Sequence, residues 1–322
     1  MRKVLLLPTA YEGILIDAWV DDIGIEHVVP IVSPTYAAHH GLRPGWCVTN
    51  VVDPQPDTRP IDDELAQRRA TVVGVISPDD ENAFAVARFL AARHGVQAVR
   101  ATTAVRSWNK VLQKRALLAH GLPTPAFEVL DPRNPRLRDI ALPCVVKVAT
   151  FNGSECMGVV RSPADEAPLF AEMHRQLEQC RGIGDPRVTY RPGDTCSPED
   201  ALLADAWLAE ALVDGDEYSC DFLVHGDSVE VLRLVRKFAA PDFGFFRGFH
   251  LFGPEEFARW PWRGELQRLC AGAALALEAG TPPTVCMMDF MVGAQGLTIV
   301  ETSARPGQSA FVLLMRRLGG RT

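Results

Sequence analysis

Short apolar runs alternate with amphipathic stretches over the first hundred residues. The runs at 3–7 and 71–77 are short and mostly apolar without alternation, which is typical of strands buried on both faces. Helical periodicity marks 12–20, 61–69 and 80–94. Because strands alternate with helices, residues 1–103 are predicted to form a parallel α/β domain.

The pattern changes in the next hundred residues, which we assign to a central α+β lobe over 104–205. A helix predicted at 107–120 ends at Gly121, and the two prolines that follow favour extended chain. Further elements are predicted as strands at 126–130, 143–149 and 158–161 and as a helix at 164–180. The stretch 181–200 is rich in Gly, Pro, Asp and Arg, which predicts an exposed loop.

From residue 206 onward the pattern is mostly that of β-strands, and we assign 206–322 to a C-terminal α+β lobe. Strands are predicted at 206–213, 217–225, 228–239, 285–292 and 296–301, and helices at 263–279 and 308–317. The His-Gly-Asp turn at 225–227 favours a hairpin between its neighbouring strands.

Composition narrows the class of protein. The chain has 322 residues, of which 47% are hydrophobic and 23% charged, and a net charge of −7. Without a basic run, it lacks the charge pattern of a nucleic-acid or anionic-membrane binder, so small molecules are the expected partners. The first apolar run stops at Pro8 and no apolar run reaches membrane length, which predicts a cytoplasmic protein. The sequence is compatible with a homodimer.

The sequence argues against a disulfide framework, a cysteine metal site and a dinucleotide-binding domain. The eight cysteines are scattered without a Cys-x-x-Cys pair, so we interpret them as reduced thiols. No Gly-x-Gly-x-x-Gly follows the first strand, which argues against a dinucleotide-binding domain.

Lysines occupy two positions at which an anion would be expected. Lys147 ends the apolar run LPCVVK at 142–147, and a lysine buried there needs a negative partner such as a phosphate. Lys110 lies near the start of a predicted helix in SWNKVLQK at 107–114, where a solvated surface lysine is the alternative interpretation.

A loop of small residues, TFNGSECMGV at 150–159, separates the strand of Lys147 from the next strand. Gly153, Ser154 and Gly158 would let backbone N–H groups approach phosphate oxygens, and the serine hydroxyl could add a bond. An ordinary turn would have the same composition.

Acidic residues interrupt two apolar strands near the end of the chain. Asp289 lies in MDFMV at 288–292, and Glu301 lies in TIVETSARPG at 298–307. An ionised carboxylate in such a strand needs a positive partner, and hard oxygen ligands on adjacent strands suit Mg²⁺, for which Mn²⁺ could substitute.

Together with LAEALVDGDEYS at 208–219, these motifs resemble, in order, those of the ATP-grasp superfamily. The resemblance extends over residues 107–310 and is to D-alanine–D-alanine ligases and L-amino-acid ligases. It implies an N-terminal parallel α/β domain followed by two α+β lobes that sandwich ATP. It also implies a carboxylate-amine ligase that works through an acyl phosphate, releases ADP and phosphate, and serves biosynthesis with amino-acid-like substrates.

The resemblance assigns roles to individual residues. The nucleotide would be bound by Lys110, Lys147, Gly153, Ser154, Gly158, Glu210, Ala211, Leu212, Val213 and Glu217, with Glu217 on the ribose. The metal would be held by Asp289, Glu301 and Ser303, where the family normally has asparagine in place of this serine. Arg305 and Lys147 would act in catalysis, the arginine on the transferring phosphate and the acyl oxyanion.

Basic and aromatic residues at 233–250 occupy the region in which related ligases build the acceptor pocket. The candidate substrate residues are Arg236, Lys237, Arg247 and His250. A hydrophobic loop packed on the core is the alternative interpretation of this region. The motifs also leave open a thiol or hydroxyl acceptor, or a nucleotide-binding protein without turnover.

Overall fold

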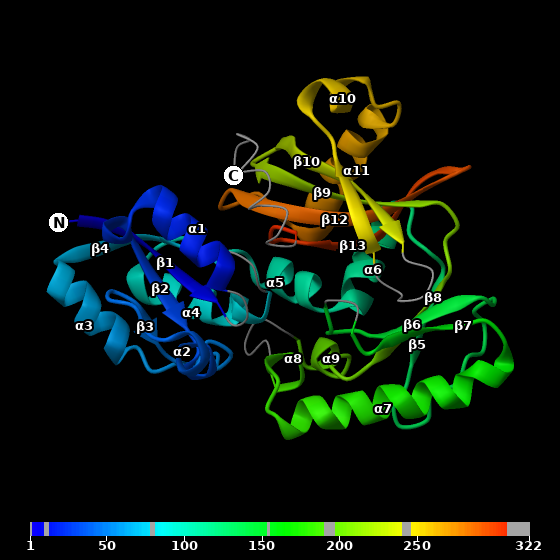
Figure 1. Ribbon diagram of the computed structural model, residues 1–322, viewed down its shortest axis with the longest axis horizontal. Coiled ribbons are helices and arrows are strands. Elements are labelled where there is room, and N and C mark those ends of the chain that lie inside the picture. The colour runs from blue at the N-terminus through cyan, green and yellow to red at the C-terminus, as the bar shows by residue number, and fades with distance from the viewer. Residues whose placement is uncertain are drawn as a thin grey trace.

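The computed structural model describes residues 2–9, 13–77, 81–152, 155–189, 197–239 and 246–307. Its strands form three sheets, and each sheet has a hydrophobic core of its own (Figure 1). An N-terminal unit contains a parallel sheet. Two antiparallel sheets, the central and the C-terminal sheet, follow along the chain and lie one above the other in Figure 1.

The N-terminal sheet confirms the predicted parallel α/β unit. Its strands, in spatial order, are β3 (Cys47–Val48), β2 (Val28–Val32), β1 (Arg2–Thr9) and β4 (Ala70–Val75). The helices of this unit are α1 (Gly13–Ile23), η1 (Ile25–His27), α2 (Pro34–His40), α3 (Arg59–Arg68), η2 (Glu81–Ala83) and α4 (Phe84–His94). Every residue of β2 is buried, yet the sequence pattern does not predict this strand because Pro30 interrupts it.

The central sheet contains β5 (Phe127–Leu130), β8 (Trp207–Ala211), β6 (Cys144–Val148) and β7 (Met157–Val160), in that spatial order. The helices described between β7 and β8 are η3 (Pro163–Asp165), α7 (Glu166–Gly182), α8 (Pro186–Thr189) and α9 (Pro198–Ala201). Helix α7 covers the sheet because Phe170, Met173 and Leu177, spaced at three and four residues, form one apolar stripe. This stripe packs around Trp207 of β8, which is fully buried.

The C-terminal sheet has one apolar and one polar face. Its strands, in spatial order, are β11 (Phe246–Leu251), β10 (Ser228–Ala239), β9 (Asp216–His225), β12 (Thr284–Gly293) and β13 (Gly296–Ser303), accompanied by α10 (Pro254–Arg259) and α11 (Arg263–Leu277). Cys220 and Phe222 of β9 share a core with Leu266 of α11. Because strand residues alternate in direction, Ser219 and Asp221 project to the opposite face.

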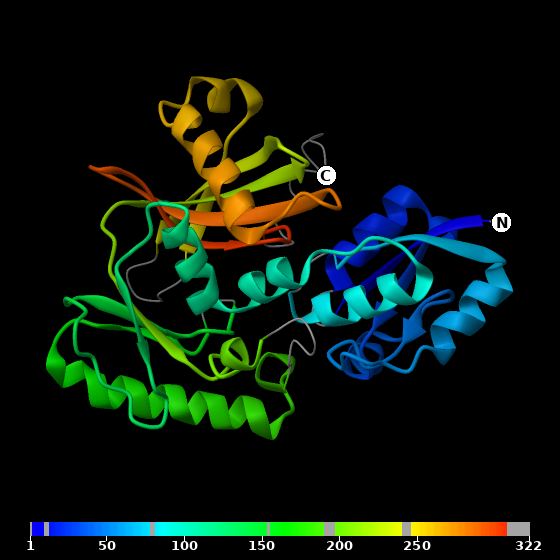
Figure 2. The same ribbon diagram turned by 180° about the vertical axis from the view of Figure 1, so that it is seen from behind.

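Two consecutive helices, α5 (Ala101–Trp108) and α6 (Lys110–Ala119), connect the N-terminal unit to the two antiparallel sheets (Figure 2). The single helix predicted over 107–120 is divided at Asn109, whose backbone is extended. The Asn109 carboxamide accepts hydrogen bonds from the N–H groups of Val111 and Leu112 at 3.0 and 3.2 Å, and so caps α6. Ala116 and Leu117 of α6 join the core beneath α11.

The boundary between the central and the C-terminal lobe was predicted at residue 205. Strand β8 begins after this boundary, yet it belongs to the central sheet. The division at 103 and 205 is otherwise still a prediction. The helix predicted at 308–317 lies outside the described residues. Within the described ranges, no helix combines the length and the apolar character that crossing a membrane requires.

Candidate functional site

A cavity of about 320 Å³ lies between the central and the C-terminal sheets. Its walls come from α6, β6, β7, β8, β9, β12 and β13 and from the segments between them. The residues named from the sequence that line it are Lys110, Lys147, Glu210, Ala211, Leu212, Val213, Glu217, Asp289 and Glu301. Residues from seven elements, separated by up to about two hundred positions, therefore meet in one cleft.

Two lysines project from the first turns of α6 toward this cleft. Because Asn109 caps the helix, Lys110 and Lys114 lie one turn apart on its buried side. The Lys110 ammonium lies 3.2 Å from Glu301 Oε1 and donates to the backbone carbonyl of Phe151. This lysine thus connects the C-terminal sheet to the loop that follows β6.

Glu210 of β8 is held between two buried lysines. Lys114 Nζ lies 2.7 Å from Glu210 Oε1, and Lys147 of β6 pairs with Glu210 Oε2. Burial alone would raise the pKa of Glu210, but the two cations lower it below its usual value. Burial lowers the pKa of Lys114 to about 8, whereas attraction to Glu210 and Glu301 outweighs burial and raises the pKa of Lys147. The sequence motif that contains Lys114 did not predict the ion pair between Lys114 and Glu210. The signal that could have indicated it is the spacing of four residues between Lys110 and Lys114, which places both on one side of a helix.

The polar face of the C-terminal sheet presents two carboxylates side by side. Asp289 of β12 is paired in register with Glu301 of β13. Lys237 of β10 donates to Asp289 Oδ2 and to Glu217 Oε1, each at 2.9 Å. Burial opposes ionisation of Glu301, but Lys110 and the other nearby cations hold its pKa at about 2. Glu301 is therefore charged at neutral pH.

The donor set at this point fits a hard divalent cation that also contacts a ligand. Asp289 Oδ1 is buried and has no hydrogen-bond partner, an arrangement that an ion would relieve. The described residues contain no group of three or more His, Cys, Asp or Glu side chains arranged for a metal. One or two protein carboxylates, with the remaining positions taken by phosphate and water, are the usual setting for Mg²⁺.

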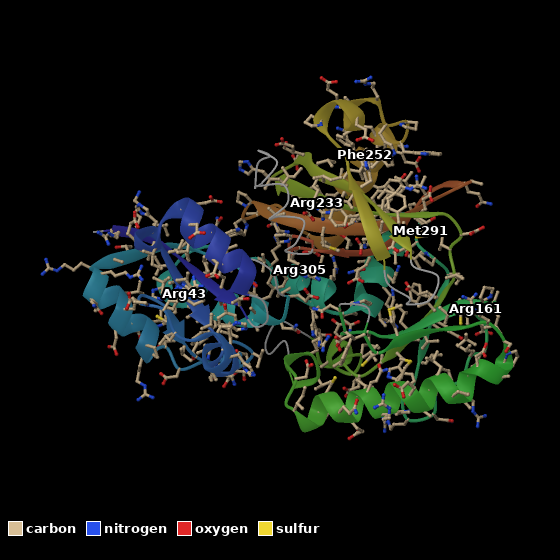
Figure 3. All side chains as sticks on the ribbon, viewed as in Figure 1. Arg43, Arg161, Arg233, Phe252, Met291 and Arg305 are labelled. Carbon is tan, nitrogen blue, oxygen red and sulfur yellow. The ribbon has the colours of Figure 1, made fainter. Side chains whose placement is uncertain are left out.

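Ser303 and Arg305 lie deeper, toward the N-terminal unit. Ser303 is fully buried, its hydroxyl has no hydrogen-bond partner, and it pairs in register with Met287, next to the row of Asp289. Arg305 donates through Nε to Glu81 of η2 and through Nη1 to the carbonyl of Pro306. Figure 3 shows Arg305 between the N-terminal unit and the C-terminal sheet. No sequence motif pointed to Glu81.

The candidate substrate residues are separated by the sheet. Lys237 projects to the face that carries Glu217 and Asp289, two residues of the cleft, whereas its neighbour Arg236 projects to the other side and pairs with Asp216 at 2.7 Å. His250 is exposed and lies 2.7 Å from Glu256 Oε1. The side chain of Arg247 lies outside the described structure, so its role as a substrate contact stays a prediction.

The small-residue loop is only partly described, because Gly153 and Ser154 lie outside the described residues. Gly158 belongs to β7, opposite Val146. A Cβ atom at Gly158 would come within 2.3 Å of Leu169 Cδ1 on α7. Packing against the helix therefore accounts for this glycine, independently of any phosphate.

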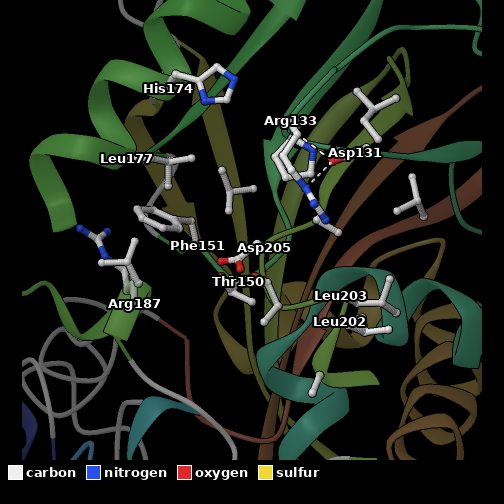
Figure 4. A pocket seen from close by; sticks show the side chains of 18 of the residues that line it. Asp131, Arg133, Thr150, Phe151, His174, Leu177, Arg187, Leu202, Leu203 and Asp205 are labelled. Carbon is white, nitrogen blue, oxygen red and sulfur yellow. Dashed lines mark hydrogen bonds and ion pairs between the residues drawn. The ribbon is translucent and has the colours of Figure 1, made fainter. Parts of the chain in front are cut away.

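A second cavity, of about 650 Å³, lies beside α7, α8 and the loop after β5 (Figure 4). Phe151 lines both cavities and so forms a shared wall. The arginines that line the second cavity pair with carboxylates: Arg133 with Asp131, Arg181 with Glu178 and Arg187 with Asp185. The cleft between the sheets is the stronger candidate site, because residues named from the sequence line it and do not line this second cavity.

Two of three comparisons with known proteins find similar proteins, and both find ligases. No family model matches the sequence. Over 138 residues, or 42% of this chain, the sequence is 30% identical to a D-alanine--D-alanine ligase of Polaromonas sp. (strain JS666 / ATCC BAA-500). The match spans 33% of that ligase, so the chain aligns with about a third of its curated relative.

Solved structures are similar over nearly the whole chain. An L-amino acid ligase from Bacillus licheniformis superimposes with a TM-score of 0.66 and 17% identity, covering 97% of this chain and 69% of that one. A D-alanine--D-alanine ligase from Bacillus anthracis superimposes with a TM-score of 0.56 and 13% identity, covering 98% and 93%. The chain therefore has the ATP-grasp fold, the fold of these ligases, as its sequence motifs predicted.

Proposed function

We propose that the protein is an ATP-dependent carboxylate-amine ligase, which forms an amide or peptide bond through an acyl phosphate. The observation that carries this proposal is the cleft between the two antiparallel sheets, where lysines and carboxylates from both sheets face each other. The fold shared with the ligases of Bacillus licheniformis and Bacillus anthracis supports the same reaction class.

ATP would lie in this cleft with its adenine against the backbone of residues 210–213, at the end of β8. Glu217 would accept hydrogen bonds from the ribose hydroxyls, since a carboxylate offers several acceptor sites and no competing donor. The triphosphate would extend toward Lys110, Lys147 and Lys237, which line or border the cavity floor. Their arrangement favours a long anion over a compact one.

Each of these lysines is paired with a carboxylate. Lys110 contacts Glu301, and Lys237 contacts both Glu217 and Asp289. When phosphates attract these lysines, the carboxylates lose cationic partners inside a site with little water. A divalent cation supplies the missing positive charge, so we propose that Asp289 and Glu301 hold Mg²⁺ together with the nucleotide. The ion would neutralise phosphate charge during transfer.

The chemistry requires positioning rather than a protein nucleophile. An oxygen of the substrate carboxylate attacks the γ-phosphorus of ATP, the bond to ADP breaks, and an acyl phosphate forms. The amine nitrogen then attacks the acyl carbon, and inorganic phosphate leaves. Arg305 would stabilise the negative charge that develops on the phosphoryl and acyl oxygens, and Glu81 fixes the direction of its guanidinium.

A two-substrate assay tests the proposal. ADP and phosphate release is measured with Mg²⁺, ATP and a panel of amino acids offered singly and in pairs, with Glu301→Gln as the inactive control. We expect release that depends on a pair, accompanied by a product lighter than the pair by one water. ATP binding without any release would instead indicate a nucleotide-binding protein, and release with only thiol or hydroxyl acceptors would replace the amine in the proposal.

A further inference from the structure

The loop between β6 and β7, residues 149–156, is anchored from outside the cleft by Arg187 of α8. The Arg187 guanidinium lies over the ring of Phe151, with Cζ 4.8 Å from the ring centroid. Its Nη2 atom lies 2.6 Å from Glu155 Oε2. Arg187 therefore contacts the described residues on both sides of the loop's small-residue centre.

Arg187 is itself fixed by a buried partner. Its Nε donates to Asp185 Oδ1 at 3.0 Å and its Nη2 to Asp185 Oδ2 at 2.7 Å, a bidentate geometry that specifies direction as well as charge. The side chains of Arg187 and Asp185 are 6% and 4% exposed, whereas that of Glu155 is 54% exposed. Arg187 and Asp185 thus form a buried ion pair, and Glu155 is the more exposed second partner of the arginine.

Glu155 poses an electrostatic problem for the proposed nucleotide site. Its side chain lines the same cavity as Lys110 and Lys147, so its negative charge lies near the expected path of the phosphates. A like charge at such a distance weakens anion binding. The ion pair with Arg187 neutralises this carboxylate and draws it toward α8.

The same loop is also held from the inside. Lys110 donates to the carbonyl of Phe151, and Thr150 Oγ1 donates to the carbonyl of Ala204 at 3.3 Å. Contacts on both sides of Phe151 define where the loop backbone lies above the cleft. A displacement of Phe151 or Glu155 would change the wall of the cleft, which both residues line.

We propose that Arg187 is a positioning residue for nucleotide binding, which holds the 149–156 loop in place and neutralises Glu155. This inference rests on the proposed function, because it concerns the ATP affinity of the same cleft. Arg187 lies outside the predicted ATP motifs, and its contacts with Phe151 and Glu155 were not predicted from them.

The test compares the dissociation constant of ATP with Mg²⁺, measured by calorimetry, across a small set of variants. We expect Arg187→Met to weaken binding by about tenfold, because one unpaired carboxylate then faces the phosphates and the contact with Phe151 is lost. Glu155→Gln alone should change affinity less than threefold. In the Arg187→Met background, however, Glu155→Gln should recover about threefold of this loss, the part due to the unpaired carboxylate, and leave the part due to the lost contact with Phe151. A purely structural arginine would not produce this coupling.

Two further variants protect the test against a folding defect. Arg187→Lys keeps a charge beside Glu155 but cannot make the bidentate contact with Asp185, so it should weaken ATP binding by about threefold through positioning alone, a loss that Glu155→Gln should not recover. Arg181→Met is the matched control, because Arg181 lines the second cavity and pairs with Glu178 without contacting the loop. Its affinity should equal that of the wild type.

The outcomes separate this inference from the proposed function. Unchanged ATP affinity in Arg187→Met and Arg187→Lys would overturn the positioning role. A loss in Arg187→Met that Glu155→Gln does not reduce would overturn the neutralisation of Glu155, and complete recovery would overturn the anchoring of the loop. Failure of the wild-type protein to bind ATP at all would instead overturn the assignment of the cleft, and with it both proposals.

Discussion

Replacing Lys114 with methionine should change how the stability of the protein depends on pH. This lysine is fully buried, lies 2.7 Å from Glu210 Oε1, and donates to Thr124 Oγ1 at 2.9 Å and to the carbonyl of Val300 at 2.5 Å. Burial lowers its pKa from the ordinary 10.5 to about 8 despite the attraction of Glu210. Methionine preserves much of the side-chain volume but removes the titrating group.

The direction of the effect follows from proton binding in the two states. Because the pKa of Lys114 is lower in the folded chain, the unfolded chain binds more protons between about pH 8 and pH 10.5. The free energy of unfolding should therefore rise with pH across this window, relative to a protein without the lysine. At about 1.36 kcal/mol per pKa unit, the full gain is roughly 3 kcal/mol.

Chemical unfolding of the wild type and of Lys114→Met at pH 7.5, 9 and 10.5 measures this gain. Subtracting one protein from the other at each pH cancels the groups that titrate identically in both, including the buried cysteines. The difference should move by roughly 3 kcal/mol in favour of the wild type between the lowest and highest pH. A difference that stays constant within about 0.5 kcal/mol would refute the argument that Lys114 is held against the cost of burial.

Four other substitutions test the site itself. Lys147→Ala should abolish ATP binding in calorimetry, since the cation paired with Glu210 at the base of the cleft is lost; near-normal affinity would contradict its role. Glu301→Gln should eliminate turnover at limiting Mg²⁺ with the fold intact by circular dichroism, and wild-type rates would remove it from the metal site. Arg305→Lys should lower kcat in single-turnover experiments by about 100-fold with little change in ATP affinity, because an ammonium cannot reproduce the planar fork; an unchanged chemical step would make Arg305 structural. Ser303→Asn should lower the Mg²⁺ concentration for half-maximal rate, and no change would indicate that this buried position never contacts the ion.

Much of the cleft could be predicted from the sequence because charged residues in apolar strands are costly unless they share a site. Asp289 and Glu301 stand out for this reason, and the register that pairs them brings their carboxylates together. Lys147 stands out at the end of its apolar run in the same way. Local sequence is sufficient in such cases, since the cost of burial is a property of the residue and its immediate neighbours.

Other features depend on packing between distant segments. Glu81 contacts Arg305 from a short turn in the N-terminal unit, more than two hundred residues away, and nothing in the residues around it indicates that partner. Arg236 and Lys237 were both associated with a substrate pocket because their segment lies where related ligases build one, yet strand alternation sends the two to opposite faces. The break at Asn109 was signalled by its capping side chain, but continuous helical periodicity on both sides obscured it.

The two-faced C-terminal sheet limits which changes in chain length this protein can tolerate. Along β9, each residue that faces α11 alternates with one that faces the cleft, and β12 is paired with it residue by residue from Thr284 to Val292. A single-residue insertion or deletion within either strand would exchange the two faces beyond that point, placing carboxylates in the helix-covered core and aromatic rings in the cleft. Related sequences should therefore vary by substitution within these strands and confine their insertions to the connections between them.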